Sequence, residues 1–493
     1  MESWNHIINI ALLGTDKRML KKEELSEIAE LFGTSNDSDK EEFFLQSAAL
    51  VYNFRQCGVV PMHREEISIS QAEKEEKTYA NQLAHRVLYD ILETGSTSLF
   101  HFWLNQCKQS GKIVQPEIIS NLFEKGMTNK SIRPLIYDCC GKRGEWLLQF
   151  NAEWKYVDTS TDEELWQTGA LEQRKNILAH IRKNDAAKAR ELLHETWPQE
   201  NAASKTELLQ QIGINPTSAD LPFLEEALNE KSVKVKETAV EILKTIPTSS
   251  IVQRYWKLLQ PFIELKKEKT LLGFSSKMVI NFLPIKEVDE SIYKTGIEKL
   301  SSDKKISDEQ FLIYQLLSSI PPSFLEEKTD LGKEDLIRSI ENSSNGRYFI
   351  SAIGRAAIRF KDLKWLRNIL ALKDISFYVE ALNILPQKEA GQYAIENLQG
   401  DTAYQIIQTV SEFTSEWSAE FTKAILKFAA INPYQYHKGF YNEIIHLLPV
   451  AVIGELEKCT PQEEHLRTMW NNLSEYISQL LTLKLQTLKA FNE

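Results

Sequence analysis

Residues 218–247, SADLPFLEEALNEKSVKVKETAVEILKTIP, predict two short amphipathic helices, the second of which ends at Pro247. Apolar residues recur in both helices at spacings of three and four, at Leu221, Leu224, Leu228, Val235, Ala239, Ile242 and Ile246. Each stripe covers one helical face and needs a neighbouring helix to bury it. A stack of such pairs is an α-solenoid, a fold that usually provides a binding surface.

The same pattern extends back to residue 133 without a strand-like segment. Leu208, Leu209 and Ile212 recur 34 positions later as Ile242, Leu243 and Ile246, a period that suits a two-helix repeat. Spacing within 232–246 is typical of HEAT-type repeats. We therefore predict an all-α chain, a HEAT-like α-solenoid of stacked helical hairpins. In its last helix we expect four side chains to stay in solvent: Lys234, Glu237, Glu241 and Lys244.

The rest of the chain also favours helices. Gly (19) and Pro (15) are sparse for 493 residues, which disfavours a turn-rich β protein. Further helices are predicted beyond Pro247, including one at 251–265 and a long one at 463–491 that we expect to close the C-terminal end of the stack. A polar stretch at 64–77 is a linker candidate. We divide the chain into an N-terminal helical region (1–135), a HEAT-like repeat region (136–250) and a C-terminal helical region (251–493).

The net charge of −11 argues against general binding to nucleic acid or to anionic membranes. Residues 231–305 are an exception, because Lys and Arg outnumber Asp and Glu there. Their cations include Lys266, Lys267 and Lys269. We interpret this excess as the solvated face of several helices. A nucleic-acid-binding helical repeat remains an alternative.

Cysteine usage and the N-terminus predict a cytoplasmic protein. The five cysteines form no CxxC pair, and their number is odd, as in a reduced protein. The N-terminal apolar run ends at Leu13 without a cleavage site and predicts a helix that stops at Gly14. No stretch approaches the ~20 apolar residues of a membrane span.

Motifs that carry chemistry are absent from the sequence. It contains no phosphate loop, dinucleotide fingerprint, nucleophile elbow or zinc helix, and we expect no catalytic residue, cofactor or metal. His194–Glu195 is the only His-Glu dipeptide, and we interpret it as helix surface. Gly141–Lys142–Arg143–Gly144 has two interpretations: an anion cradle at a helix start, or a tight turn between helices with exposed cations.

A set of short strings resembles one bacterial family. They are Trp4, ALLGTD (11–16), GKRGEWL (141–147), Asn151, Trp154, Trp166, Thr168–Gly169, Arg174, Leu178, Asp185, ARELL (189–193), Trp197, Pro222, FLEEAL (223–228), VKETAVEIL (235–243) and LLSSIPPSF (316–324). This family consists of helical-repeat proteins of unknown function. Its members are commonly encoded beside MoxR-type AAA ATPases, von Willebrand A-domain proteins and SWIM zinc-finger proteins. The resemblance is dense over 141–247 and assigns no catalytic residue.

We expect a non-enzymatic scaffold or adaptor for protein–protein interaction. The resemblance implies a protein partner such as a MoxR-type AAA ATPase or a SWIM zinc-finger protein. Because a solenoid exposes the second helices of its repeats in a concave groove, we predict an interaction surface that includes Lys142, Arg143, Lys205 and Lys236. An enzyme whose site is assembled from distant residues is a further alternative, since such a fold hosts binding proteins and enzymes alike.

Overall fold

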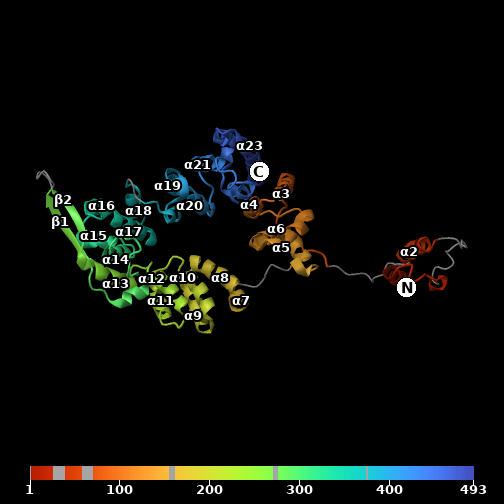
Figure 1. Ribbon diagram of the computed structural model, residues 1–493, viewed down its shortest axis with the longest axis horizontal. Helices are drawn as coiled ribbons and strands as arrows, with labels where there is room; N and C mark the ends of the chain where they lie inside the picture. The colour runs from red at the N-terminus through yellow and green to blue at the C-terminus, as the bar shows by residue number, and fades with distance from the viewer. Residues whose placement is uncertain are drawn as a thin grey trace. The chain divides into compact units, whose positions relative to one another are not determined.

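The computed structural model describes residues 2–25, 39–57, 70–154, 162–269, 276–372 and 376–492. It confirms a mostly helical chain (Figure 1). Two compact units are present, Met1–Ala72 and Glu73–Glu493. The boundary falls inside the polar stretch 64–77 that predicts a linker, of which residues 64–69 lie outside the described residues. The predicted divisions at 135 and 250 stay predictions, and the first falls within a helix.

Among the described residues of the first unit, 2–25, 39–57 and 70–72, there are two α-helices and a short 3-10 helix. They are α1 (Glu2–Leu13), η1 (Lys22–Leu25) and α2 (Lys40–Cys57). Helix α1 ends as predicted, because Gly14 follows it with φ 88°, a left-handed conformation that glycine adopts without strain. The core of this unit is small: Ile7, Ile10, Leu20, Leu25 and Val51.

The second unit begins with a helical cluster. Its elements are α3 (Gln82–Thr94), α4 (Thr97–Gln109), η3 (Pro116–Ile118), α5 (Ile119–Thr128), η4 (Lys130–Ile132), α6 (Arg133–Leu147) and η5 (Ala152–Trp154). The side chain of Asn81 caps α3 by accepting from the Ala84 amide, and Gly95 ends it in the left-handed region. A single connected set of buried apolar side chains extends from Ala80 to Phe491.

The following helices pack in two layers. They are α7 (Asp162–Thr168), α8 (Leu171–Asn184), α9 (Ala186–Thr196), η6 (Trp197–Gln199), α10 (Ala202–Ile212), η7 (Ser218–Asp220), α11 (Leu221–Ala227) and α12 (Val233–Leu243). Helices α8, α10 and α12 contact one another in series, while α9 packs on α8 and α11 packs on α12 (Figure 1). We call α8–α12 the stack.

The predicted face of α12 is correct except at one position. Val235, Ala239, Ile242 and Ile246 are buried, and Lys234 is exposed. Lys244, however, is only 6% exposed. Its ammonium binds Glu241 Oε1 at 2.7 Å and lies against Gly296, which belongs to a segment distant in sequence. Helical periodicity gives the face of a side chain, but it gives no sign of a later segment that covers that face.

The helix predicted at 251–265 is wrong in its last part. Helix α13 (Ser250–Leu259) and η8 (Gln260–Phe262) are followed by β1 (Ile263–Lys269) and β2 (Ser276–Phe282). The strands pair antiparallel, from Ile263 opposite Phe282 to Lys269 opposite Ser276. Pro261 explains the change, because proline lacks an N–H and disfavours a continuing helix. The β-branched Val279 and Ile280 favour a strand and are buried.

After the hairpin the chain is helical again. Its elements are η9 (Glu290–Thr295), α14 (Asp308–Leu317), α15 (Ser323–Thr329), α16 (Lys333–Glu341), α17 (Gly346–Arg359), α18 (Leu363–Leu370), η10 (Val379–Asn383), α19 (Gln387–Glu396), α20 (Gly400–Ser411), α21 (Ala419–Ala430), α22 (Lys438–Ile444), η11 (Ile445–Leu447), η12 (Val450–Cys459) and α23 (Glu464–Asn492). Strand β2 packs on α16. Helix α23 packs on α3 and α4, near the beginning of the second unit. We call these three helices the junction.

Candidate functional site

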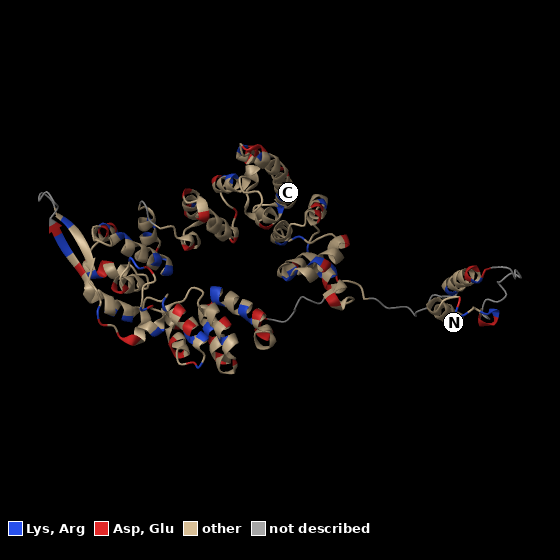
Figure 2. Cartoon of the chain, viewed as in Figure 1, with Lys and Arg blue, Asp and Glu red and all other residues tan. Residues whose placement is uncertain are grey.

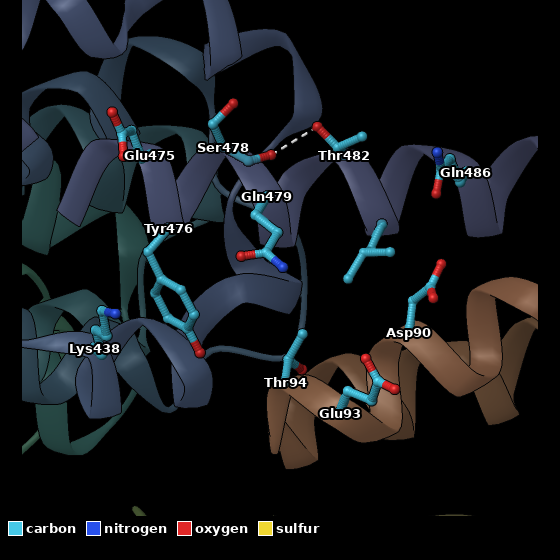
Figure 3. Close-up of a pocket in the computed structure, with 11 residues that line it drawn as sticks. Asp90, Glu93, Thr94, Lys438, Glu475, Tyr476, Ser478, Gln479, Thr482 and Gln486 are labelled. Atoms are coloured by element: carbon cyan, nitrogen blue, oxygen red, sulfur yellow. Dashed lines mark hydrogen bonds between the residues drawn. The ribbon is translucent and has the colours of Figure 1, made fainter. Parts of the chain in front are cut away.

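An open groove lies between α3 and α23 in the junction. Its volume is about 800 Å³. Residues that line it come from α3, α22 and α23: Asp90, Glu93, Thr94, Lys438, Glu475, Tyr476, Ser478, Gln479, Thr482, Leu483 and Gln486. Asp90 and Glu93 extend from α3 toward α23 (Figure 3). From α23, Gln479 extends toward α3, and Tyr476 extends toward α22. We call this site the α3–α23 groove.

Contacts between distant segments set the geometry of the groove. The side-chain amide of Asn81 donates to the Ala490 carbonyl at 2.9 Å. This hydrogen bond joins the start of α3 to the end of α23. The Ser96 hydroxyl donates to the Asn442 carbonyl at 2.9 Å and thereby joins α22 to the loop between α3 and α4. Ala84, Val87, Leu88 and Ile91 face the core, so the helical period leaves Asp90 and Glu93 on the exposed side of α3.

The groove has a negative charge. Asp90, Glu93 and Glu475 contribute three carboxylates, and Lys438 contributes one ammonium. The Lys438 ammonium lies over the ring of Tyr476, 4.8 Å from its centroid. The Tyr476 hydroxyl donates to Asn442 Oδ1 at 2.6 Å. Among the described residues, Asp90 and Glu93 form no ion pair, so their charge is available to a cationic ligand.

Beside the groove, α23 carries a buried lysine that joins this helix to the segment 416–448. Lys484 is fully buried, and its ammonium donates to Glu416 Oε2 at 2.6 Å, to the His446 carbonyl at 2.8 Å and to the Leu448 carbonyl at 2.6 Å. Burial lowers the pKa of Lys484, whereas its hydrogen bond to Glu416 opposes that shift. The ammonium thus serves the structure of the site and is not open to a ligand.

Two residues of the predicted surface, Lys142 and Arg143, lie at a break inside α6. Gly141 has φ 61° and interrupts the helix. The Lys142 and Arg143 amides donate to the two oxygens of Glu75, at 2.9 and 2.8 Å. A Cβ on Gly141 would lie 2.4 Å from Glu75 Oε2, so glycine is required for this approach. These amides therefore bind the chain's own carboxylate, which is a structural contact.

The other two predicted residues, Lys205 and Lys236, lie on α10 and α12, in the same layer of the stack. Lys205 is committed to internal contacts: its ammonium binds Glu230 Oε1 at 2.6 Å and lies 4.9 Å from the centre of the Trp197 ring. Lys236 is half-buried on α12. None of the four predicted cations lines the α3–α23 groove.

The basic segment that motivates the nucleic-acid alternative includes the hairpin. Lys266 and Lys267 are exposed on β1, and the side chain of Lys269 lies outside the described residues. Acidic residues alternate with them, and Lys266 binds Glu264 at 2.6 Å. Figure 2 shows the two charges mixed along β1. This strand therefore offers no continuous row of cations for a phosphate backbone.

The described residues offer no support for a metal site or for thiol chemistry at Cys139 and Cys140. In these ranges no group of three or more His, Cys, Asp and Glu residues is arranged to hold a metal ion. Cys139 and Cys140 are buried. A hydrogen bond with Cys107, together with burial, raises the pKa of Cys139, and burial raises the pKa of Cys140. Raised pKa values disfavour the thiolate, which is the reactive form.

Sequence alone did not reveal the groove. The stripe of α23 was visible, but its partner α3 lies almost the full chain away. None of the helices in the described ranges is both long and apolar enough to cross a membrane.

The fold and its open groove identify the chain as a mostly helical protein. Proteins of this class have many different activities, so the fold does not specify one. The chain belongs to a family of unknown function, DUF5691, whose model matches residues 6–491. The match thus includes the C-terminal third, where the sequence strings gave no resemblance. Comparisons with curated proteins and with solved structures found no match.

Proposed function

We propose that this chain is a non-enzymatic scaffold or adaptor built as a HEAT-like α-solenoid. The observation that carries the proposal is the serial packing of α8, α10 and α12, with α9 and α11 forming a second layer. Stacking of this kind extends a surface along successive repeats. Such a surface suits a protein partner, because its contacts can be spread over many side chains.

A buried ionic network supports the repeat interpretation. The Arg182 guanidinium on α8 binds both oxygens of Asp220, at 2.9 and 2.6 Å, and donates to the Ile214 carbonyl at 2.9 Å. Arg190 on α9 binds the same carboxylate at 2.8 Å. One network therefore joins α8 and α9 to the start of α11.

The α3–α23 groove supplies a place for the partner. Its three carboxylates and open form suit a cationic protein segment. For the partner we retain the expectation from the family resemblance, an AAA ATPase of the MoxR type or a SWIM zinc-finger protein. We place the complex in the cytoplasm.

Affinity purification tests this proposal. The tagged chain should be isolated from its own host, and co-purifying proteins identified by mass spectrometry. We expect an AAA ATPase or a SWIM zinc-finger protein with the wild type and a large loss with Asp90→Lys/Glu93→Lys. The control is Glu117→Lys/Glu124→Lys, which introduces the same charge change at exposed residues that do not line the groove.

Two results would contradict the proposal. One is that the chain is isolated without either protein, even after cross-linking in the cell. The other is catalytic turnover by the purified chain that is lost when groove residues are replaced while helicity and melting are unchanged. That second result would establish the enzyme alternative.

A further inference from the structure

A second groove lies on the stack, in the layer formed by α9 and α11. Its volume is about 420 Å³. Eight residues line it: Arg190, Glu191, His194, Glu195, Ala219, Pro222, Phe223 and Glu226. We call this site the α9–α11 cleft. It lies in the layer opposite to that of α10 and α12. The interaction surface predicted from sequence includes Lys205 on α10 and Lys236 on α12, so the cleft is a different surface.

The floor of the cleft is apolar and rigidly supported. The Phe223 ring is 7% exposed and packs edge-on against Trp197, with 5.0 Å between the ring centroids. Ala219 and Pro222 are exposed beside it. Trp197 is itself fixed, because its indole N–H donates to Glu230 Oε1 at 2.8 Å. A floor of this kind accepts one aliphatic or aromatic side chain.

Three carboxylates surround the floor. Glu191 and Glu195 are exposed on α9, and Glu226 is exposed on α11. His194 Nε2 lies 4.0 Å from Glu226 Oε2, whereas Glu191 and Glu195 form no ion pair among the described residues. The only guanidinium of the cleft, that of Arg190, is held by the buried Asp220. The available charge is therefore negative.

We infer that the α9–α11 cleft binds a basic amphipathic helix of a partner protein. Glu191 and Glu195 are four residues apart, so they lie about 6 Å apart along the axis of α9. A partner helix with Lys or Arg at positions i and i+4 presents its cations at the same spacing. An apolar side chain between them then meets Phe223. Helices that bind in grooves use this combination of an apolar anchor and flanking charges.

This inference deepens the adaptor proposal, on which it rests, by stating the chemistry of one partner segment. Charge complementarity selects the occupant: a rim of carboxylates excludes an acidic segment and attracts a cationic one. The apolar floor distinguishes an amphipathic helix from a purely charged polymer. Both features can be tested separately in the peptide and in the chain.

Fluorescence anisotropy with the full-length chain provides the test. The probe is a labelled helical peptide of about 15 residues made of Lys, Leu and Ala, with lysines at i and i+4 beside a leucine stripe. Two control peptides replace Lys by Glu or Leu by Ser. Measurements at about 0.15 M salt suppress long-range attraction to the acidic chain.

We expect the Lys/Leu peptide to bind the wild type, and both control peptides to bind at least about tenfold more weakly. Glu191→Lys/Glu195→Lys should weaken binding about tenfold or more, whereas Glu225→Lys/Glu237→Lys should change it less than about twofold. The second double variant introduces the same charge at exposed residues outside the cleft. Unchanged helicity and melting temperature would show that both variants are folded.

Three outcomes would overturn the inference. They are absence of binding by the wild type, equal effects of the two double variants, and equal binding of the Leu→Ser peptide. If instead the wild-type chain self-associates and the Glu191→Lys/Glu195→Lys variant does not, the occupant of the cleft is a second copy of the chain. Failure of this peptide-binding test would leave co-purification of the partner protein intact. It is therefore distinguishable from failure of the adaptor proposal.

Discussion

The stack and the junction are both helical, yet they are held together over very different sequence distances. In the stack, the buried Arg182–Asp220 pair joins residues 38 positions apart. In the junction, the Asn81–Ala490 hydrogen bond joins residues 409 positions apart. Each region also buries a charged side chain, Asp220 in one and Lys484 in the other. Similar interactions thus stabilise a local and a non-local assembly.

Because their contacts span such different sequence distances, the stack and the junction should respond differently to substitution. Loss of a stack interaction should disturb neighbouring helices only, because α8, α10 and α12 contact one another in series. Loss of a junction interaction disturbs the attachment of α23 to the helices near the start of the second unit.

The largest effect is expected at Asp220. Asp220→Ala leaves the fully buried Arg182 side chain without its carboxylate, and breaking a buried pair in this way costs about 3–5 kcal/mol of unfolding free energy. Urea unfolding followed by circular dichroism measures the change. Glu225→Ala, at an exposed residue of the adjacent helix α11, should change the unfolding free energy little. Equal losses at the two positions would contradict the account of the stack.

A purely apolar contact in the stack should have a comparable effect. Ile242 is 8% exposed on the inner face of α12, and Ile242→Ala should cost about 2–5 kcal/mol of unfolding free energy. The exposed Lys234 is its control on the same helix, and Lys234→Ala should change stability little. If both substitutions are equally costly in urea unfolding, the assigned face of α12 is wrong.

In the junction, Lys484→Met keeps the aliphatic chain and removes the ammonium. The His446 and Leu448 carbonyls then lose a donor, and we expect a loss of about 1–3 kcal/mol. Hydrogen exchange should show faster opening of α23 and of residues 446–448 than of α8 and α10. Lys489→Met, at an exposed position of α23, is the control. Uniform acceleration over both regions would show that the junction does not open separately.

The contact of Glu75 with α6 should contribute less. Glu75→Ala leaves the Lys142 and Arg143 amides without their acceptor, which resembles loss of a helix cap and costs about 0.5–2 kcal/mol. The neighbouring Glu76 is exposed, so Glu76→Ala is the matched control. Thermal unfolding of the two variants would distinguish a structural carboxylate from a solvated one. A melting temperature unchanged by Glu75→Ala would contradict the capping role.

The smallest effect concerns pH. Burial raises the pKa of Asp220, but hydrogen bonds from Arg182, the Thr217 amide and Arg190 outweigh burial and hold the pKa below 3.8. The stability from this carboxylate is therefore present above pH 3.8 and is lost as pH falls through the lower folded-state pKa. Asp220→Asn should flatten the acid limb of the stability profile. The measurement is urea unfolding between about pH 2 and 5. If the loss of unfolding free energy with falling pH is the same in Asp220→Asn, other carboxylates cause that loss.

The stack was largely predictable from sequence, whereas the candidate sites were not. Its apolar stripe in 232–246 was correct because each buried position repeats with the period of a helix. The grooves depend on which helices become neighbours. His194–Glu195 was recognised as helix surface, but the position of His194 beside Phe223 follows from the placement of α9 next to α11.

The helical character, the inner face of α12 and the end of α1 at Gly14 could be read from the chain's local pattern. These features depend on residues within a few turns of one another. Three features depend on packing between distant segments. They are the pairing of α3 with α23, the burial of Lys244 and Lys484, and the hydrogen bonds from the α6 amides to Glu75. Each of these brings together groups far apart in the chain. A local pattern of side chains states that a surface must be covered, but it does not state which segment covers it.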